Sequence, residues 1–459
     1  MLSRDERIVA LAAFVPRCAV MLWAWGRFPA TADGSYYHRL ATRLADGHGY
    51  TWLWPDGAVT YASHYPVGYP AVLSVLYRMF GAHEGVAMLL ATVFGTLAAL
   101  ATHGLMRRWR RVAFVAGLLV ALHPGLVFYT PALMTEAITA YLLVICAWGV
   151  VAIRRRPRWW RYVALGLGMG LCILVRPQCL LLAPVFGFVA APNRRGVTRR
   201  LAMAALVTAT ALATVSPWTY RNCRRMDRCA LVSVNGGWNL LIGTQPEGNG
   251  AWSELRVPPA CATVFHEAKA DSCFERVARE RIAAQPGAWL RLMPDKLSST
   301  FDYCGAPGWY LHAANEAAFG KRAKLVLGVG ETLYERVVML LALLACWPRR
   351  NTFLPCRKTW RRRDWLAASL VAGGAVMLFT RAGWVAVLLL LAALVAARPQ
   401  WWRRPQLAFG LTFAVLACTA LVHAVFFGGG RYAMLAFPFL CALAAVGGSR
   451  LRRSGVKSR

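Results

Sequence analysis

The chain has 459 residues, 58% of them hydrophobic, with 53 Lys and Arg against 20 Asp and Glu. Repeated apolar runs of membrane length exclude an ordinary soluble fold, which would need charged domain surfaces. The net charge of +33 suggests nucleic-acid binding at first sight. The positions of the charges argue against it, because 30 of the 53 basic residues lie in seven short segments between apolar runs, near 1–7, 107–111, 154–161, 193–200, 348–363, 398–404 and 450–459.

These basic segments define an expected topology. If each is cytoplasmic, every intervening pair of spans closes correctly, as the positive-inside rule requires, and contact with anionic headgroups accounts for the charge. We therefore predict an all-α polytopic protein of the inner (plasma) membrane, with both termini cytoplasmic and no nucleic-acid partner. The twelve predicted spans are 8–26, 86–106, 112–130, 134–153, 162–175, 178–191, 200–216, 325–347, 365–380, 382–397, 406–427 and 431–448.

Two pairs of these spans leave alternatives open. The pairs 162–191 and 365–397 each have short halves around an arginine, Arg176 or Arg381, so each is two spans, a re-entrant hairpin or one long bent helix. The first span has no small-residue cleavage site after it, which favours a retained helix over a removed signal.

Two segments are not membrane-like, 27–85 and 217–324, and the topology places both outside the cell membrane. The apolar stretch 66–80 is too short to cross and is expected to be a helix at the interface. The sequence thus divides into an N-terminal membrane module at 1–216 that contains the first outer loop, an extracytoplasmic segment at 217–324, and C-terminal membrane helices at 325–459.

Five of the thirteen cysteines lie in the large outer segment, a compartment that permits disulfides. Their spacing makes the pairs Cys223–Cys229 and Cys261–Cys273 plausible and leaves Cys304 over, although connectivity cannot be deduced from a sequence. No Cys and His set has the spacing of zinc ligands.

Asp33 is the first candidate for chemistry. It follows the first apolar run and opens the stretch Asp33-Gly34-Ser35-Tyr36-Tyr37, in a loop of aromatic residues, Gly and His. A carboxylate just outside the membrane suits general-base work on a substrate that arrives through the lipid. The simpler interpretation is an N-cap of a helix that begins near Ser35, and the two roles are compatible.

Glu136 is the second candidate, at the outer start of the span 134–153. The simple interpretation is a charge that favours a helix N-terminus, but acids within apolar helices are costly and usually functional. Asp33 and Glu136 lie at matching depths, so they could share a divalent cation such as Mg or Mn, or one could orient the substrate of the other. His64 and His123 are on the same side and could add a ligand, although an interfacial hydrogen bond is the commoner role.

Further candidates would bind substrate. An anionic lipid-phosphate leaving group needs cations, and the outer face offers Arg176, Arg221, Lys296 and Arg431, for which snorkelling to headgroups is the simpler role. Asn235 and Trp238 in Asn235-Gly236-Gly237-Trp238-Asn239 could bind and stack on a sugar, or the stretch is a plain turn. Tyr37 and Tyr69 of the first outer loop complete the set.

These residues, in their order, resemble a known family. The first outer loop carries Asp33, Tyr37, Ala41, Leu44, Gly47, Gly49-Tyr50, Pro66, Gly68-Tyr69-Pro70, Tyr77 and Phe80-Gly81. The later pieces are Met134-Thr135-Glu136, Arg176-Pro177, Pro217-Trp218, Arg221-Asn222, Asn235–Asn239, Lys296 and Arg431-Tyr432. Together they are similar to bacterial relatives of the dolichyl-phosphate-mannose–protein mannosyltransferases, membrane glycosyltransferases of the GT-C class (glycosyltransferase family 39 and the aminoarabinose lipid A transferase group).

The resemblance implies a polyprenyl-phosphate sugar donor, an acceptor outside the membrane that is protein, lipid or glycan, and a one-step inverting transfer with Asp33 as the base. Two positions depart from the family pattern. Many relatives have Asp-Glu where this chain has Asp33-Gly34, and many have Pro where this chain has Val67. The missing Glu puts a cation site borrowed from Asp-Glu members in doubt and makes Glu136 the better second acid.

Two other classes of function stay open at this stage. A transporter or flippase of a lipid-linked sugar predicts inverted repeats and a site at the membrane midplane, whereas this sequence shows no repeat and its acids gather at one face. An oligosaccharide polymerase or ligase would use a long lipid-linked glycan. A scaffold without chemistry leaves the positions of Asp33 and Glu136 unexplained.

Overall fold

The computed structural model describes residues 2–192, 196–245, 248–264, 266–348, 361–397 and 407–455. Within these ranges six helical segments are long and apolar enough to cross a membrane. They are α1 (Arg4–Ala24), α4 (Glu84–Leu105), α7 (Thr135–Arg155), α10 (Gly196–Arg225), α19 (Leu407–Val425), and the 3-10 turn η4 (Gly430–Ala436) with α20 (Phe437–Gly455). The other helices of the bundle are α5 (Arg110–Ala121), α8 (Trp159–Val175), α9 (Ala183–Ala190), α16 (Lys321–Leu344), α17 (Arg362–Met377) and α18 (Gly383–Ala397). The predicted all-α polytopic membrane fold is therefore confirmed.

Shorter elements connect the bundle helices. The first outer loop holds α2 (Asp33–Ala45), the antiparallel strands β1 (Thr51–Leu53) and β2 (Val59–Tyr61), in which Trp52 pairs with Thr60, and α3 (Gly68–Phe80). The outer segment contains α11 (Gly236–Ile242), η3 (Pro259–Cys261), α12 (Glu267–Ala284), α13 (Pro286–Arg291), α14 (Met293–Phe301) and α15 (Ala306–Ala314). Two short connectors remain: α6 (Pro124–Phe128) lies inside the predicted span 112–130, and η1 (Pro177–Leu181) begins just before the predicted span 178–191.

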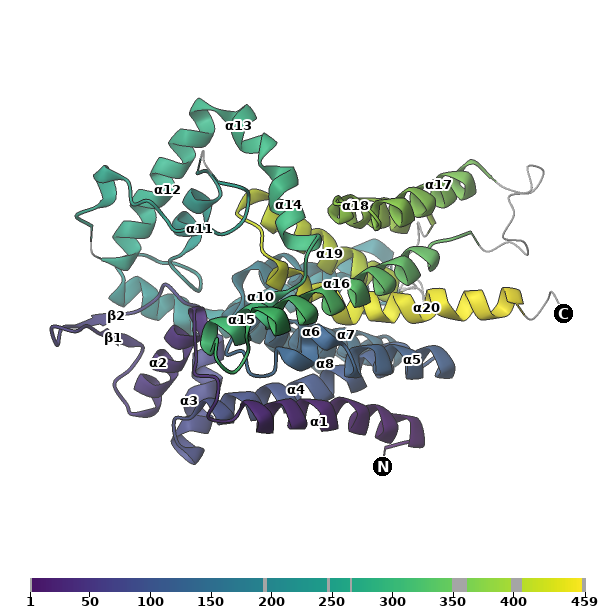
Figure 1. Ribbon diagram of the computed structural model, residues 1–459, viewed down its shortest axis with the longest axis horizontal. Coiled ribbons are helices and arrows are strands. Elements are labelled where there is room, and N and C mark those ends of the chain that lie inside the picture. The colour runs from purple at the N-terminus through teal and green to yellow at the C-terminus, as the bar shows by residue number, and fades with distance from the viewer. Residues whose placement is uncertain are drawn as a thin grey trace.

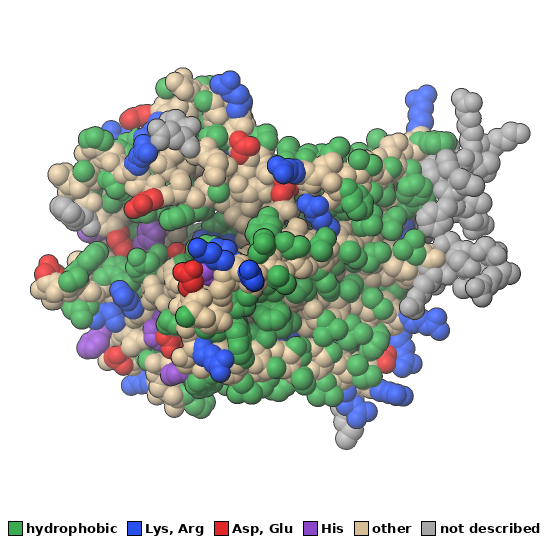
Figure 2. Space-filling model, in the orientation of Figure 1, with side chains coloured by type: hydrophobic (Ala, Val, Ile, Leu, Met, Phe, Trp, Pro, Cys, Tyr) green, Lys and Arg blue, Asp and Glu red, His purple; other side chains and the backbone are tan. Residues whose placement is uncertain are grey.

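The two ends of the molecule differ in composition. Helices α1, α4, α16 and α20 run along the long axis, and both chain termini lie at one end, whereas α2, α3, the β1–β2 hairpin and α11–α13 lie at the other (Figure 1). Hydrophobic side chains cover much of the middle of the surface, whereas Asp, Glu and His side chains lie mostly toward the end away from the termini, and Lys and Arg appear at both ends (Figure 2). The two polar segments thus share one end of the bundle, as the positive-inside pattern predicts.

The predicted span 112–130 is wrong as a continuous helix. Pro124 has no N–H and its ring clashes with a preceding turn, so α5 ends at Ala121 and α6 begins at Pro124. The buried guanidinium of Arg17 binds the carbonyls of Val120, at 3.1 Å, and Ala121, at 2.7 Å, at this end of α5.

His123 lies at this break and caps α6, because its Nδ1 accepts the Leu126 N–H at 3.3 Å. Its Nε2 pairs with Glu335 of α16, and its ring stacks on Phe437. These contacts hold the break inside the bundle. The suggestion that His123 adds a ligand beside Asp33 and Glu136 finds no support in them.

Two other boundaries become definite. The pair 162–191 is broken at Arg176-Pro177 into α8, η1 and α9, with Arg176 in extended conformation, and the pair 365–397 forms two separate helices. Helix α10 continues through Pro217 to Arg225, so the predicted boundary between residues 216 and 217 falls inside a helix. Most of the basic segment expected at 348–363, and all of the one expected at 398–404, lie outside the described residues.

The outer segment is held together by covalent and ionic contacts. The disulfides Cys223–Cys229 and Cys261–Cys273 are both present, which confirms the plausible pairs, and Cys304 is a buried free thiol. Asp271 of α12 bonds Arg228 at 2.8 Å and the Trp238 N–H at 3.0 Å. These contacts tie the start of α11 to α12.

We predict that the two pairs behave as structural disulfides. Replacing both Cys261 and Cys273 with Ser should lower the free energy of unfolding by about 2–4 kcal/mol, because the cross-link restricts the unfolded chain. The thermal unfolding midpoint of the purified full-length protein measures the loss. The matched control is Cys18→Ser, a free thiol in α1. Equal midpoints for both variants under oxidising conditions would contradict a structural bridge.

Candidate active site

Asp33 is the first residue of α2, and its carboxylate does not cap that helix. The N-cap position belongs to Ala32, and no side chain bonds to the first-turn N–H groups. The predicted N-cap role is therefore wrong. Ala32 has a φ of 49°, in the left-handed region that residues other than glycine rarely adopt. Such strain gathers at functional sites because the surrounding structure has to enforce it.

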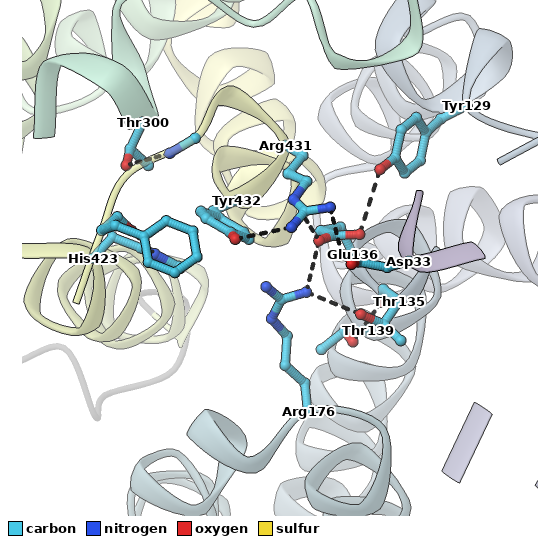
Figure 3. A network of polar contacts seen from close by, with 12 residues as sticks. Asp33, Tyr129, Thr135, Glu136, Thr139, Arg176, Thr300, His423, Arg431 and Tyr432 are labelled. Carbon is cyan, nitrogen blue, oxygen red and sulfur yellow. Dashed lines mark hydrogen bonds and ion pairs between the residues drawn. The ribbon is translucent and has the colours of Figure 1, made fainter. Parts of the chain in front are cut away.

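The guanidinium of Arg431 binds both predicted acids (Figure 3). Its Nη1 lies 2.8 Å from Asp33 Oδ2, its Nε lies 3.3 Å from Glu136 Oε1, and its Nη2 donates to the Tyr432 hydroxyl at 3.1 Å. One side chain near the C-terminus thus joins α2 and α7, and it brings together residues that the sequence separates by 398 positions.

Arg176 reaches the same carboxylate from the break between α8 and η1. Its Nη1 lies 3.1 Å from Glu136 Oε1 and donates to Thr135 Oγ1 at 3.1 Å. The other oxygen of Glu136 accepts the Tyr129 hydroxyl at 3.4 Å. The two guanidiniums lie 5.0 and 5.1 Å from the centre of the Tyr432 ring, a favourable distance for cation–π contact. Asp33, Glu136, Arg176 and Arg431, here called the ion-pair network, balance two negative charges with two positive ones.

The two acids differ in exposure. The side chain of Asp33 is 33% exposed, whereas that of Glu136 is 3% exposed. A buried ion pair that loses one partner leaves an uncompensated charge, which costs about 3–5 kcal/mol. Glu136 is therefore suited to hold Arg176 and Arg431, while Asp33 is the carboxylate that a second molecule can reach.

The turn before Arg431 fits only glycine at two positions. A Cβ at Gly428 would lie 1.9 Å from the carbonyl oxygen of Lys296, and one at Gly430 would lie 2.3 Å from that of Tyr303. Gly428 also donates its N–H to the Gly250 carbonyl at 2.8 Å. The turn is thus clamped between α14, the residues that follow α14, and the loop between α11 and η3, which fixes the start of η4 and the position of Arg431.

Close packing explains why a glycine stands at position 34. A Cβ at this position would lie 2.8 Å from the Tyr310 hydroxyl oxygen and 3.1 Å from the Leu133 carbonyl. That hydroxyl accepts the N–H groups of Thr31 and Leu133, each at 3.3 Å. In this chain Tyr310 occupies the space that a larger residue after Asp33 would need, which accounts physically for the departure from Asp-Glu.

The tyrosines of the first outer loop differ in how directly they contact Asp33. The Tyr65 hydroxyl donates to Asp33 Oδ1 at 3.4 Å, and burial together with the charge of Asp33 raises the pKa of Tyr65 well above its usual value. Tyr37 packs edge-to-face on Tyr65 and on Tyr69, with ring centres 5.2 and 5.7 Å apart. Tyr37 therefore lies at the edge of the site, and the buried Tyr69 packs against Tyr37.

Lys296 lies on α14 close to the glycine turn. Its Nζ donates to the Val425 carbonyl at 3.1 Å and sits 5.3 Å from the centre of the Trp289 ring. Burial lowers the pKa of Lys296 to about 8. The amine therefore loses its charge close to neutral pH, and it lies beside the segment that carries Arg431.

Other predicted residues have structural partners elsewhere. Arg221 donates to the carbonyls of Ala62 and Tyr50, at 2.8 and 2.9 Å, and lies over Trp218. It therefore fastens the first outer loop to α10, and none of its contacts among the described residues involves the ion-pair network. Asn235 accepts from Ser233 at 3.0 Å just before α11.

Trp238 and His64 pack against each other where the two outer segments meet. Their ring centres are 5.4 Å apart, and Phe274 packs on the other side of Trp238. Burial lowers the pKa of His64. A Cβ at Gly237 would lie 2.0 Å from the Asp271 carbonyl, whereas one at Gly236 would meet no atom within 4 Å, so Gly237 alone serves helix packing here. The contacts of Trp238 are aromatic ones within the protein.

The geometry of the two acids does not fit a divalent cation shared between them. Arg431 binds one oxygen of each carboxylate, so the charge that a cation would supply is already provided by a guanidinium. Across the described ranges, no three His, Cys, Asp or Glu side chains gather as a set of ligands. The involvement of Mg or Mn stays a prediction, and the mechanism below uses no step through a metal.

Several residues at the site were not predicted from the sequence. Tyr65, Tyr129, Tyr310 and Tyr432 each contact a member of the network or the backbone next to it. Glu267 of α12 accepts the Trp52 Nε1–H at 2.5 Å and the N–H groups of Ser63 and His64 at 2.6 and 3.0 Å. Tyr432 could have been found from its place beside Arg431 in the motif, whereas nothing near Glu267 in the sequence points to the first outer loop.

Comparison with known proteins agrees with the resemblance seen in the sequence. Residues 64–220 match the family model described as dolichyl-phosphate-mannose-protein mannosyltransferase, which confirms the resemblance over that part of the chain. The matched part includes Glu136 and Arg176, whereas Asp33 and Arg431 lie outside it. No curated protein matches the chain. The match supports the class of membrane glycosyltransferases that use a lipid-linked donor.

Among solved structures, two of ArnT from Cupriavidus metallidurans are similar to this chain. One is described as bound to undecaprenyl phosphate and the other as the apo state. Each has 18% sequence identity and a TM-score of 0.41, and the alignments cover 99% and 97% of this chain and 78% of the other.

We predict that position 34 does not accept a side chain. Gly34→Ala places a methyl group against the Tyr310 hydroxyl, and such overpacking costs about 1–3 kcal/mol. The unfolding midpoint of the purified protein should fall, together with any activity that depends on Asp33. Gly149→Ala in α7 is the control, because a Cβ there meets no atom within 4 Å. Equal midpoints for the two variants would contradict the close approach of Tyr310.

Proposed function

We propose that this protein transfers a sugar from a polyprenyl-phosphate donor to an acceptor at the extracytoplasmic face of the inner (plasma) membrane, with inversion at the anomeric carbon. The observation that carries the proposal is the ion-pair network, in which a partly exposed carboxylate stands beside two guanidiniums. The network lies between α2, α7 and η4, next to the end of the bundle that holds both outer segments (Figures 1 and 3). With both termini cytoplasmic, that end faces outward.

Asp33 acts as the general base in this mechanism. Its carboxylate takes the proton from an acceptor hydroxyl or amine as the acceptor atom attacks the anomeric carbon. A bond from the acceptor to that carbon forms while the bond from the carbon to the phosphate oxygen breaks, and the electron pair leaves with the polyprenyl phosphate. Arg431 orients the base through Oδ2, and Tyr65 contacts Oδ1.

The leaving group is already an anion, so it needs cations rather than an acid. A guanidinium has five N–H groups. Arg176 uses Nη1 for Glu136 and Thr135 and Nε for Gln178, and its Nη2 has no acceptor among the described residues. Arg431 and Lys296 likewise have N–H groups left beyond their contacts. These three residues are proposed to bind the donor phosphate, with Glu136 positioning both arginines.

The transporter interpretation predicts a midplane site formed by broken helices. The network does include Arg176 from the break between α8 and η1. It gathers, however, at the first residues of α2 and α7, at the end shared by the outer segments. A partly exposed base at that end favours chemistry on an acceptor from the outer compartment.

The experiment that tests the proposal is transfer of radiolabelled sugar from polyprenyl-phosphate mannose and related donors in membranes. Asp33→Asn keeps the shape of the side chain and removes the base, so transfer should fall by at least about 100-fold while the protein still inserts and accumulates. Asp46→Asn, an exposed carboxylate at the other end of α2, should transfer normally. Abundant, fully active Asp33→Asn protein would rule out this base.

Donor binding should depend on pH through Lys296. Because burial lowers the pKa of Lys296 to about 8, its ammonium is present below that pH and is lost as the pH rises through it. The KM for the lipid donor should therefore increase between about pH 7.5 and 9. In Lys296→Arg the guanidinium stays charged, so the rise should disappear. A KM that is flat with pH in the wild type would remove Lys296 from the phosphate site.

A further inference from the structure

Three aromatic side chains line the approach to Asp33, and we name Tyr36, Trp52 and Tyr65 the aromatic wall. Tyr36 stacks on Tyr65, with ring centres 5.1 Å apart and planes 18° apart. Trp52 meets both rings edge-on, with centres at 5.8 Å from Tyr36 and 6.3 Å from Tyr65. Tyr36 remains 42% exposed.

Two of the three polar groups of the wall have partners inside the protein. The Trp52 Nε1–H donates to Glu267 Oε1, and the Tyr65 hydroxyl donates to Asp33 Oδ1. Glu267 also binds two backbone N–H groups of the loop that holds Tyr65, so α12 fixes the wall in place. What the wall presents to a ligand is therefore mainly ring surface, held rigidly beside a carboxylate.

The position of the wall connects the outside with the base. Tyr36 follows Asp33 by one helical turn of α2, which puts the two side chains on one side of that helix. The space-filling view shows a hollow between the part that holds α11–α13 and the part that holds α2 and the hairpin, with acidic and histidine side chains along it (Figure 2). The hairpin, which carries Trp52, lies at the far end of the molecule from the termini (Figure 1).

Resting on the proposed function, we infer that the aromatic wall is the acceptor subsite and that the acceptor is a saccharide. A pyranose ring has an apolar C–H face that packs on an aromatic face, and its hydroxyls project sideways from that face. A sugar on Tyr36 would lie one helical turn from Asp33. Tyr65, which stacks on Tyr36, contacts Asp33 through its hydroxyl and so connects the two positions. A peptide acceptor would call for polar partners for its backbone, whereas the Trp52 N–H and the Tyr65 hydroxyl are engaged within the protein.

The inference is tested by direct binding to the full-length protein in lipid nanodiscs. Saturation-transfer NMR with methyl α-mannopyranoside and methyl β-glucopyranoside as probes should show ring protons in contact with the wild type and with Tyr36→Phe. In Tyr36→Ala the binding should weaken by up to about tenfold, the loss expected for one aromatic contact. Tyr220→Ala, an exposed tyrosine on α10 outside the wall, should bind as the wild type does.

The same variants separate this inference from the proposed function. With a bound glycoside as acceptor, Tyr36→Ala should raise the acceptor KM by a similar factor and leave the donor KM unchanged. Equal binding by Tyr36→Ala and the wild type, or contact only with the peptide probe acetyl-Ala-Ser-Ala-amide, would overturn the saccharide subsite. Glycoside binding at Tyr36 together with full transfer by Asp33→Asn would leave the subsite in place and reject Asp33 as the base.

Discussion

The bridge that Arg431 makes between Asp33 and Glu136 is the interaction on which the site depends. It joins the first turn of α2, the first turn of α7 and the start of η4 in one charged group. Coulomb attraction is stronger at such low exposure than in water, but taking the charges out of water is costly. The structure offsets that cost by giving every carboxylate oxygen in the network a partner, with Tyr65 and Tyr129 on the oxygens that the arginines leave open.

Close backbone contacts hold this bridge in position. The glycine turn brings η4 against α14, and Gly34 brings the start of α2 against Tyr310 of α15. The strained φ of Ala32 belongs to the same arrangement, because it starts α2 at Asp33 without using the carboxylate as a cap. The ends of the bundle elements are thus fitted to one another around the ion pairs, and the outer segment supplies two of the surfaces.

The sequence predicted the kind of residue at the site better than the direction in which each one points. Topology and charge type singled out Asp33, Glu136, Arg176 and Arg431, and the structure brings these four together. The same signals singled out Arg221, yet its guanidinium binds carbonyls of the first outer loop. Position in an outer loop decides the side of the membrane, whereas orientation depends on contacts with residues far away in the chain. The breaks in the helices were predicted equally unevenly. The break at Arg176-Pro177 could be predicted because it lies between two short apolar runs. The break at His123-Pro124 could not, because it lies inside one long apolar run.

The balance of charge in the network bears on how such a site would accelerate transfer. At rest, two guanidiniums face two carboxylates, so in the proposed mechanism the donor phosphate meets a site whose charges are already balanced, although N–H groups remain to bind it. In the proposed mechanism Asp33 takes the acceptor proton, so its negative charge disappears at the moment when charge develops on the departing phosphate oxygen. Arg431 then has one anionic partner fewer within the protein and one more on the leaving group. An attraction that strengthens only as the bonds change stabilises the transition state more than the bound donor, which is the condition for raising the rate.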